Sequence, residues 1–140
     1  MNIHLVTTDE AIRACFPVMR ELRPHLDVGG FVAQVRDMST CGYRLAALLS
    51  GTQPVAVAGF RIAENLAWGR HLYVDDLVTA AAQRSQGHGA ALLRWLREHA
   101  RKHQCRQLHL DSGMQRVDAH RFYAREGMTK AGYHFVQQLE

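Results

Sequence analysis

The feature that most constrains the fold is a helix pattern that follows a strand pattern after a short loop with two glycines. In residues 87–103, small or apolar residues recur at the spacing of one buried helix face, at Gly89, Leu92, Leu93, Leu96 and Ala100. Residues 70–80 before the loop and residues 106–112 after the helix are interpreted as strands. The order strand, helix, strand predicts a crossover unit, in which the helix packs on a sheet that contains both strands.

Further strand and helix patterns surround this unit. Thr7 and Glu10 have the spacing of a capping box, which predicts that a helix begins there, and Pro17 predicts a kink or break in that helix. The remaining elements are expected as a strand at 3–6, a helix at 27–38, strands at 43–50 and 54–66, a helix at 116–126 ended by Gly127, and a last strand at 131–139. The predicted order is β-α-α-β-β-β-α-β-α-β, an α/β fold of the mixed α+β type.

The size and charge of the chain are those of one globular domain. Its 140 residues are enough to bury a core, and we expect a single domain over residues 1–140. The formal net charge is +4, from 17 Lys and Arg against 13 Asp and Glu. That balance fits a pocket for an anionic ligand as well as it fits nucleic acid. Clustered basic runs with interleaved aromatics are missing from the sequence, so we expect no nucleic-acid partner.

The cysteines and the first residues indicate the compartment. The sequence has an odd number of cysteines, and no two of them form a CxxC pair. This predicts free thiols in a reducing environment for Cys15, Cys41 and Cys105. The first residues, MNIHLVTTDEAIRAC, lack the basic start and the long apolar stretch of a signal peptide. No apolar run in the sequence approaches the length of a membrane span. We therefore expect a cytoplasmic protein without a membrane partner.

The loop AQRSQGHG, residues 82–89, has the properties of a phosphate-binding site. It leads from the end of a predicted strand to the start of a helix, where backbone N–H groups lack partners and the helix dipole favours an anion. Gly87 and Gly89 allow a ligand to approach the backbone, and Arg84 adds a positive charge. A Walker loop would need a lysine after the second glycine, and a dinucleotide fingerprint would need a third glycine, so both of these interpretations fail.

The pattern R-x-x-G-x-G at residues 84–89 resembles the Q/R-x-x-G-x-G/A motif of the GCN5-related N-acetyltransferase (GNAT) family, which holds the pyrophosphate of acetyl-CoA. The flanking stretch DDLVTAAAQRSQGHGAALLRWL looks like that family's strand, loop and helix. DAHRFYAREGM looks like its later helix, with Tyr123 four residues before Gly127. The resemblance is close over residues 70–128 and loose over residues 1–50. It implies a GNAT-like central mixed, twisted and splayed β-sheet flanked by helices.

The resemblance implies acetyl-CoA as cosubstrate and a primary amine as acceptor, with direct attack of the neutral amine on the thioester in a ternary complex. No metal is expected. In the family, a central strand pairs with pantetheine and the acetyl carbonyl, and the loop amides hold the pyrophosphate. Arg116 stands where the family often has an asparagine that touches the cofactor, and an arginine there can reach a phosphate. The implied cofactor-binding residues are Leu77, Val78, Thr79, Arg84, Ser85, Gln86, Gly87, His88, Gly89 and Arg116.

The same resemblance implies two catalytic residues. Tyr123 matches the family's tyrosine near the thioester sulfur, so we expect it to be the general acid that protonates the thiolate. Asp75 stands where several members carry a glutamate that takes the proton of the amine, and we expect it to be the base. Asp75 and Asp76 are adjacent on a predicted strand, which would direct them to opposite faces. Alternative bases are water and the side chains of Asp76, His109, Asp111, His120 and His134.

The acceptor amine is the part of the function that the sequence defines least. We expect a small molecule rather than a protein; Glu21, Asp27 and Glu64 are acidic candidates for binding a cationic amine, although solvated charges are favoured. His99 and His103 have the spacing of a helical metal pair, but no third ligand is indicated, and a solvated helix face is favoured. The alternative function is a CoA-binding sensor or regulatory module without catalysis. A last strand with a free edge predicts pairing into a homodimer.

Overall fold

The computed structural model describes residues 2–140 as two compact units, of which the first ends at His109 and the second begins at Leu110. A five-stranded sheet has the order β1-β2-β3-β4-β5, and neighbouring strands from β1 to β4 are antiparallel. Among the described residues, no helix has the length and apolar character needed to cross a membrane. The strands are β1 (Asn2–Leu5), β2 (Arg44–Ser50), β3 (Gln53–Asn65), β4 (Gly69–Thr79) and β5 (Gln107–Leu110).

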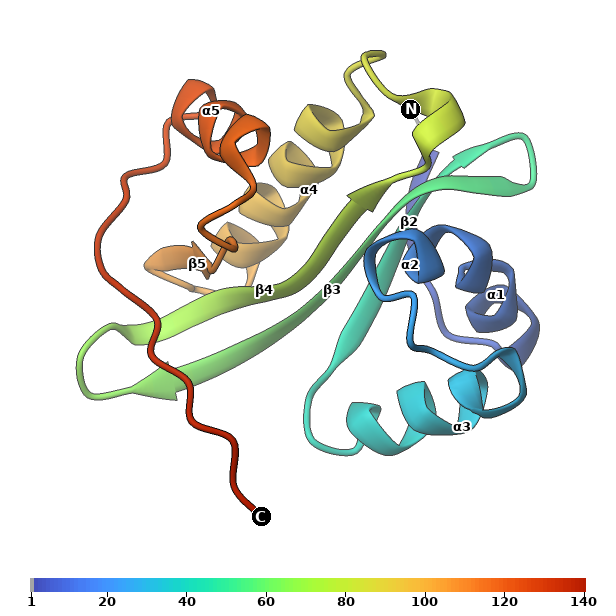
Figure 1. Ribbon diagram of the computed structural model, residues 1–140, viewed down its shortest axis with the longest axis horizontal. Coiled ribbons are helices and arrows are strands. Elements are labelled where there is room, and N and C mark those ends of the chain that lie inside the picture. Colours follow the sequence, from blue (N-terminus) through green and yellow to red (C-terminus); the bar gives the residue numbers. More distant parts are fainter. Residues whose placement is uncertain (1) are drawn as a thin grey trace. The chain divides into compact units, whose positions relative to one another are not determined.

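Helices cover both faces of the sheet in the first unit (Figure 1). Three short helices lie on one face and one longer helix lies on the other, so the sheet forms the middle layer. The chain passes from β4 through the longer helix to β5, as the predicted crossover requires. The helices are α1 (Asp9–Ala14), α2 (Phe16–Leu22), α3 (Val28–Ser39), the 3-10 helix η1 (Ala81–Gln83) and α4 (His88–Lys102).

Each face of the sheet has its own buried core because side chains alternate along a strand. Val57 of β3 packs in the core under α1, α2 and α3. Phe60 of the same strand points to the opposite face, where its ring meets the Trp95 ring of α4 at 6.2 Å between centroids. The face of α4 that the sequence pattern predicted is confirmed, since Leu92, Leu93 and Leu96 are fully buried.

The predicted helix near the N-terminus is confirmed as two helices that meet at Cys15. Pro17 lies in the first turn of α2, where its missing N–H leaves no hydrogen bond unmade, so the chain breaks there and restarts. The predicted capping box is wrong by one residue. Thr8, not Thr7, is the N-cap of α1, and its hydroxyl accepts a hydrogen bond from the Ala11 N–H at 3.1 Å.

The predicted last strand is wrong. In the second unit the structure forms α5 (Val117–Arg125), which ends before Gly127 with its φ of 88°. Residues 131–139, all of them described, have no regular structure, and Tyr133 and Phe135 are 84% and 91% exposed. Alternating apolar residues favour a strand only where a neighbouring strand supplies hydrogen bonds and a surface to pack on.

A β-bulge in β4 changes where its two aspartates point. Gly59 of β3 pairs with Asp76 and Phe60 pairs with Val74, which leaves Asp75 as the extra residue. The bulge interrupts the alternation of side chains, so the expectation that Asp75 and Asp76 face opposite sides is wrong. Both carboxylates lie on the face covered by α1, α2 and α3, where Asp75 accepts hydrogen bonds from Arg61 and Asp76 accepts one from Arg23.

Gly59 allows the close packing opposite this bulge. A Cβ atom at this position would lie 1.9 Å from the hydroxyl oxygen of Tyr43 and 2.5 Å from Oδ2 of Asp76. The Tyr43 hydroxyl donates a hydrogen bond to that same Asp76 oxygen at 2.8 Å. Tyr43 directly precedes β2, so this hydrogen bond to β4 passes over β3, and it can do so only because residue 59 has no side chain.

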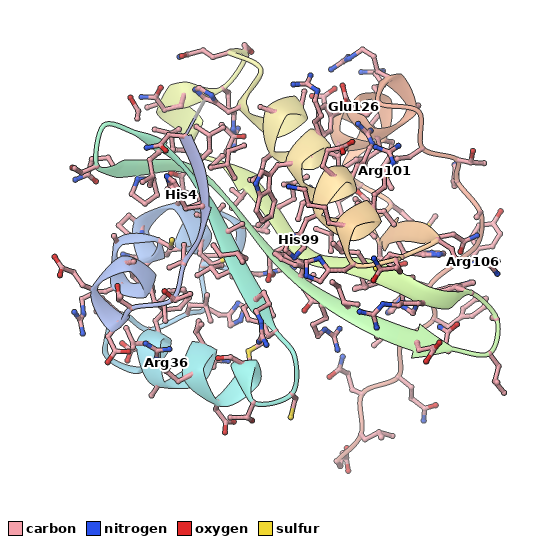
Figure 2. All side chains as sticks on the ribbon, turned by 180° about the vertical axis from the view of Figure 1, so that it is seen from behind. His4, Arg36, His99, Arg101, Arg106 and Glu126 are labelled. Carbon is pink, nitrogen blue, oxygen red and sulfur yellow. The ribbon has the colours of Figure 1, made fainter. Side chains whose placement is uncertain are left out.

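His99 projects from α4 (Figure 2) and contacts three other rings on the other face of the sheet. Its imidazole stacks on Trp95 at 4.9 Å between centroids, meets Phe60 edge-on at 5.3 Å and lies 4.3 Å from His103. Burial lowers the pKa of His99 below its ordinary value of 6.5, and the neighbouring His103 and Lys102 lower it further. The neutral imidazole is therefore favoured in the folded protein.

We expect Gly59→Ala to destabilise the protein by about 1–3 kcal/mol, because its Cβ must displace Tyr43 and break the hydrogen bond to Asp76. Urea unfolding measures the change. Gly132→Ala is the matched control: a Cβ there meets nothing within 4 Å, and its effect should stay within about 0.5 kcal/mol. A Gly59→Ala protein as stable as the wild type would show that Tyr43 is not tightly packed.

We expect the free energy of unfolding to fall as the pH is lowered through the ordinary histidine pKa. The pKa of His99 is lower in the folded state than in the unfolded chain. The neutral imidazole of His99 therefore makes its full contribution to the free energy of unfolding above about pH 6.5. At lower pH this contribution is lost, because the unfolded chain takes up the proton first. Urea unfolding from about pH 7.5 to about pH 5 should show a shallower fall in His99→Gln. His4→Gln, at an exposed position on β1, controls for loss of an imidazole; an unchanged slope in His99→Gln would contradict this prediction.

Candidate active site

The glycine-containing loop leads from the end of β4 to the start of α4, as the sequence predicted. After Thr79 the chain enters η1, becomes extended at Arg84, and turns at Ser85 and Gly87, both of which have left-handed backbones with φ of 65° and 80°. A serine rarely adopts this conformation, so Ser85 holds a strained turn. Gly87 is the N-cap of α4 and adopts its positive φ without steric cost.

The N-terminus of α4 is open to an anion. Gly87 has no side chain to cap the helix, and the first turn of α4 contains no acidic residue. The N–H groups of the first turn therefore lack side-chain acceptors at the positive end of the helix dipole. Nδ1 of His88 is buried without a hydrogen-bond partner in the described part of the chain. The structure thus brings together the predicted cofactor residues from Arg84 to Gly89 around this helix end.

The start of the loop is held by Glu21, one of the acidic side chains that the sequence offers for binding the acceptor. Oε1 of Glu21, at the end of α2, accepts a hydrogen bond from the Ala81 N–H at 2.8 Å. The Ala80 N–H donates to the Val55 carbonyl at 2.8 Å, which ties the loop to β3. Glu21 therefore positions the loop through its backbone, a contact between residues far apart in the sequence.

The predicted thioester-binding segment, Leu77 to Thr79, lies in β4 just beyond the bulge. Along one edge it pairs with β3, with Leu77 opposite Ala58 and Val78 opposite Val57. A ligand that hydrogen-bonds to the backbone of this segment must therefore approach the other edge of β4. The segment leads directly into the loop, so the backbone groups of both lie along one continuous stretch of chain.

The two aspartates form a partly buried cluster with residues that the sequence did not single out. Both carboxylate oxygens of Asp75 accept hydrogen bonds from Arg61, at 2.8 and 3.0 Å. Nε of Arg23 donates to Oδ1 of Asp76 at 3.0 Å, and its Nη2 donates to the carbonyl of Asp75 at 2.9 Å. Tyr43 completes the cluster through Oδ2 of Asp76. These partners come from the end of α2, the start of β2 and the middle of β3, so no local motif could have revealed them.

Tyr43 is a hydrogen-bond donor rather than an acid in this cluster. The residue is 4% exposed. Burial raises the pKa of Tyr43 well above its ordinary value, and the charges of Asp76 and Asp75 raise it further against the opposing effect of Arg23. Tyr43 therefore keeps its proton at any physiological pH and holds Asp76 in one orientation.

A pocket of about 300 Å³ opens beside Asp76 on the α1–α3 face of the sheet. Its polar end is formed by Asp76, Tyr43 and Arg23, and its walls are mostly apolar side chains of α2 and α3. Concave sites with apolar walls and a few convergent polar groups are the usual form of small-molecule sites. The lining residues are Met19, Arg23, His25, Leu26, Phe31, Gln34, Val35, Met38, Tyr43 and Asp76.

Tyr123 and Arg116 belong to the second unit. Tyr123 is half-buried on α5, and its carbonyl accepts a hydrogen bond from the Met128 N–H at 3.0 Å. Burial raises the pKa of Tyr123 above its ordinary value of 10.0, and the positive charge of Arg116 opposes that rise. The phenol therefore stays protonated at neutral pH, as a general acid must.

The candidate histidine bases have other contacts. His109 stacks on Trp68 at 3.6 Å between ring centroids. In the second unit, Nε2 of His120 lies 2.8 Å from the Gly113 carbonyl, and His134 lies 3.6 Å from Asp111. These contacts give each ring a structural partner.

Comparison with known proteins places the chain among acetyltransferases. The model of the Acetyltransferase (GNAT) family matches residues 7–128. An uncharacterized N-acetyltransferase of Bacillus subtilis (strain 168), YhdJ, is 36% identical over 137 residues, which are 95% of this chain and 96% of that protein. Aminoalkylphosphonate N-acetyltransferase of Salmonella typhimurium (strain LT2) is 32% identical over 111 residues, 79% of this chain and 70% of that protein.

The fold is also that of a solved acetyltransferase. The structure of an aminoglycoside N-acetyltransferase in complex with CoA matches with a TM-score of 0.86 and covers 99% of this chain and 93% of its own, at 9% identity. The family match crosses the β4–loop–α4 segment described above, and both curated relatives are N-acetyltransferases. The chain therefore belongs to the GNAT family and is an acetyl-CoA-dependent N-acetyltransferase.

Proposed function

We propose that acetyl-CoA binds with its pyrophosphate on the loop from Arg84 to Gly89 and its thioester along Leu77 to Thr79. The observation that carries this proposal is the uncapped N-terminus of α4, whose first turn has neither a side-chain cap nor an acidic residue. Arg84 supplies a positive charge beside it, and Arg116 of the second unit is proposed as a further phosphate ligand. The residues 1–140 act as one acetyltransferase domain, which is supported by a family match that extends across both units.

We further propose direct transfer in a ternary complex, with Asp75 as the base and Tyr123 as the acid. Asp75 is bound by Arg61 at both oxygens, and each oxygen keeps a second lone pair that can accept a hydrogen bond from the amine or from a water molecule. Its neighbour Asp76 stays the alternative base, because it lines the pocket directly. The raised pKa of Tyr123 keeps its proton available for the departing thiolate.

The acceptor is proposed to be a small-molecule amine rather than a protein. A pocket of about 300 Å³ is within the range of small-ligand sites. The Salmonella relative carries the name of a small substrate class, the aminoalkylphosphonates, which supports the same choice.

The homodimer is proposed to involve residues 131–139, which expose Tyr133, Phe135, Val136 and Leu139. The cytoplasmic location stays a prediction.

We expect acetyl-CoA to raise the melting temperature by several degrees, because a ligand at ~100 times its Kd stabilises the folded state by about 2.7 kcal/mol. ATP should give no such shift. Arg84→Glu should weaken acetyl-CoA binding at least ~10-fold, because it places a negative charge beside the phosphates. Arg94→Glu, at an exposed position of α4, makes the same charge change away from the loop and should not. Equal effects of the two variants, or no shift with acetyl-CoA, would contradict the proposed cofactor site.

We expect Tyr123→Phe to lower kcat by about 10²-fold or more, since the leaving thiolate loses its proton donor. The KM for acetyl-CoA should change little. Because the pKa of Tyr123 is raised, the wild-type rate should show no alkaline loss caused by this group below about pH 10. Tyr133→Phe, 84% exposed in the same unit, is the matched control. Retention of most of kcat in Tyr123→Phe, with an unchanged melting temperature, would exclude it as the acid.

A further inference from the structure

We propose that the acceptor is a primary amine attached to an aromatic or branched apolar group, and that this group binds in the pocket between α2, α3 and β4. This inference rests on the proposed N-acetyltransfer and defines the substrate class of the same site. The observation that supports it is that the pocket has mostly apolar walls and one polar end.

The walls of the pocket fit an apolar group. Met19, Leu26, Phe31, Val35 and Met38 contribute half of the lining residues. Phe31 is fixed from behind by an edge-on contact with Phe16 at 5.3 Å between ring centroids, so the wall at this point is rigid. Methionine side chains on the other walls are flexible and polarisable, and they adapt to an aromatic ring.

The size of the pocket sets the size of that group. An apolar protein cavity of ~150 Å³ holds a benzene molecule. The pocket beside Asp76 has about 300 Å³, which is enough for one aromatic ring and a short alkyl chain. A short unbranched amine would contact fewer of these apolar side chains than an aromatic or branched one, and would gain less from burial.

The polar end of the pocket fits an amino group. Asp76 is held by Tyr43 and Arg23, one at each oxygen, and its side chain is 14% exposed. Each oxygen has a second lone pair for an amine N–H. Asp76 directly precedes Leu77, so an amine bound here lies beside the strand segment proposed to hold the thioester. The apolar group then extends away from β4 along α2 and α3.

The charges in the lining disfavour highly charged acceptors. Among the lining residues, Asp76 carries the carboxylate and Arg23 carries the guanidinium. The two form an ion pair, with 3.0 Å between Nε of Arg23 and Oδ1 of Asp76. A dianionic phosphonate that binds the remaining N–H groups of Arg23 faces the carboxylate of Asp76 at close range, and this like-charge contact disfavours it. A polyamine has several positive charges, and the lining offers Asp76 as the carboxylate to bind them. An amine with one charge and an apolar body satisfies the pocket without disturbing the pair.

The experiment compares four amines with acetyl-CoA, with CoA release as the measure: phenethylamine, ethylamine, aminoethylphosphonate and spermidine. We expect phenethylamine to have a kcat/KM about 10- to 100-fold above that for ethylamine, as burial of a phenyl group provides, and also above the values for the phosphonate and spermidine. Met38→Ser removes one apolar wall at a position that is 38% exposed, where folding tolerates the change. It should lower the ratio of kcat/KM between phenethylamine and ethylamine.

Met114→Ser, at an 85% exposed methionine of the second unit, is the matched control and should leave that ratio unchanged. A higher kcat/KM for the phosphonate or for spermidine, or no turnover of phenethylamine, would overturn the proposed acceptor class. An equal loss for phenethylamine and ethylamine in Met38→Ser would overturn the assignment of the pocket. The proposed cofactor site fails separately, through absence of an acetyl-CoA-induced shift in melting temperature.

Discussion

The β-bulge at Asp75 is the constraint on which the candidate active-site face of the first unit depends. Because the bulge adds one residue to β4, two consecutive carboxylates lie on the same side of the sheet. Two adjacent negative charges on one partly buried face require compensation. Arg23 and Arg61 supply it, and Arg23 at the same time links the end of α2 to the backbone of β4 at the bulge. The loop after β4 is anchored to the same helix through Glu21, so bulge and loop are positioned together.

Two chemically different sites are built around one strand. The end of β4 leads into a loop whose character depends on backbone geometry: left-handed turns at Ser85 and Gly87 and an uncapped helix end. The middle of β4 contributes to a pocket whose character depends on side chains from α2, α3 and the start of β2. Under the proposed function, the anionic cofactor binds at the first site and the amine at the second. A strand that contributes to both sites would bring the donor and the acceptor of a group transfer close together, which is the entropic advantage of a ternary complex.

The sequence predicted the helices and strands of the first unit to within a few residues, because each has a local signal. The α4 face follows from apolar spacing, and the break before α2 follows from Pro17. The failures have physical reasons as well. Thr8 replaces Thr7 as the N-cap, since its hydroxyl alone caps the Ala11 N–H and needs no glutamate three residues later. The strand expected at 131–139 is missing because apolar alternation describes a strand's side chains but does not provide a neighbouring strand.

The prediction that residues 84–89 bind an anion follows from the sequence alone, because a glycine at a helix start and a nearby arginine are local features of the chain. The tertiary structure decided which residues surround the aspartates. Tyr43, Arg23 and Arg61 are separated from them by long stretches of chain, and a hydrogen bond between side chains leaves no trace in local periodicity. The tertiary structure also decided to which face of the sheet the Asp75 side chain points. A bulge is defined by how two strands pair, so it cannot be predicted from the sequence of either strand alone.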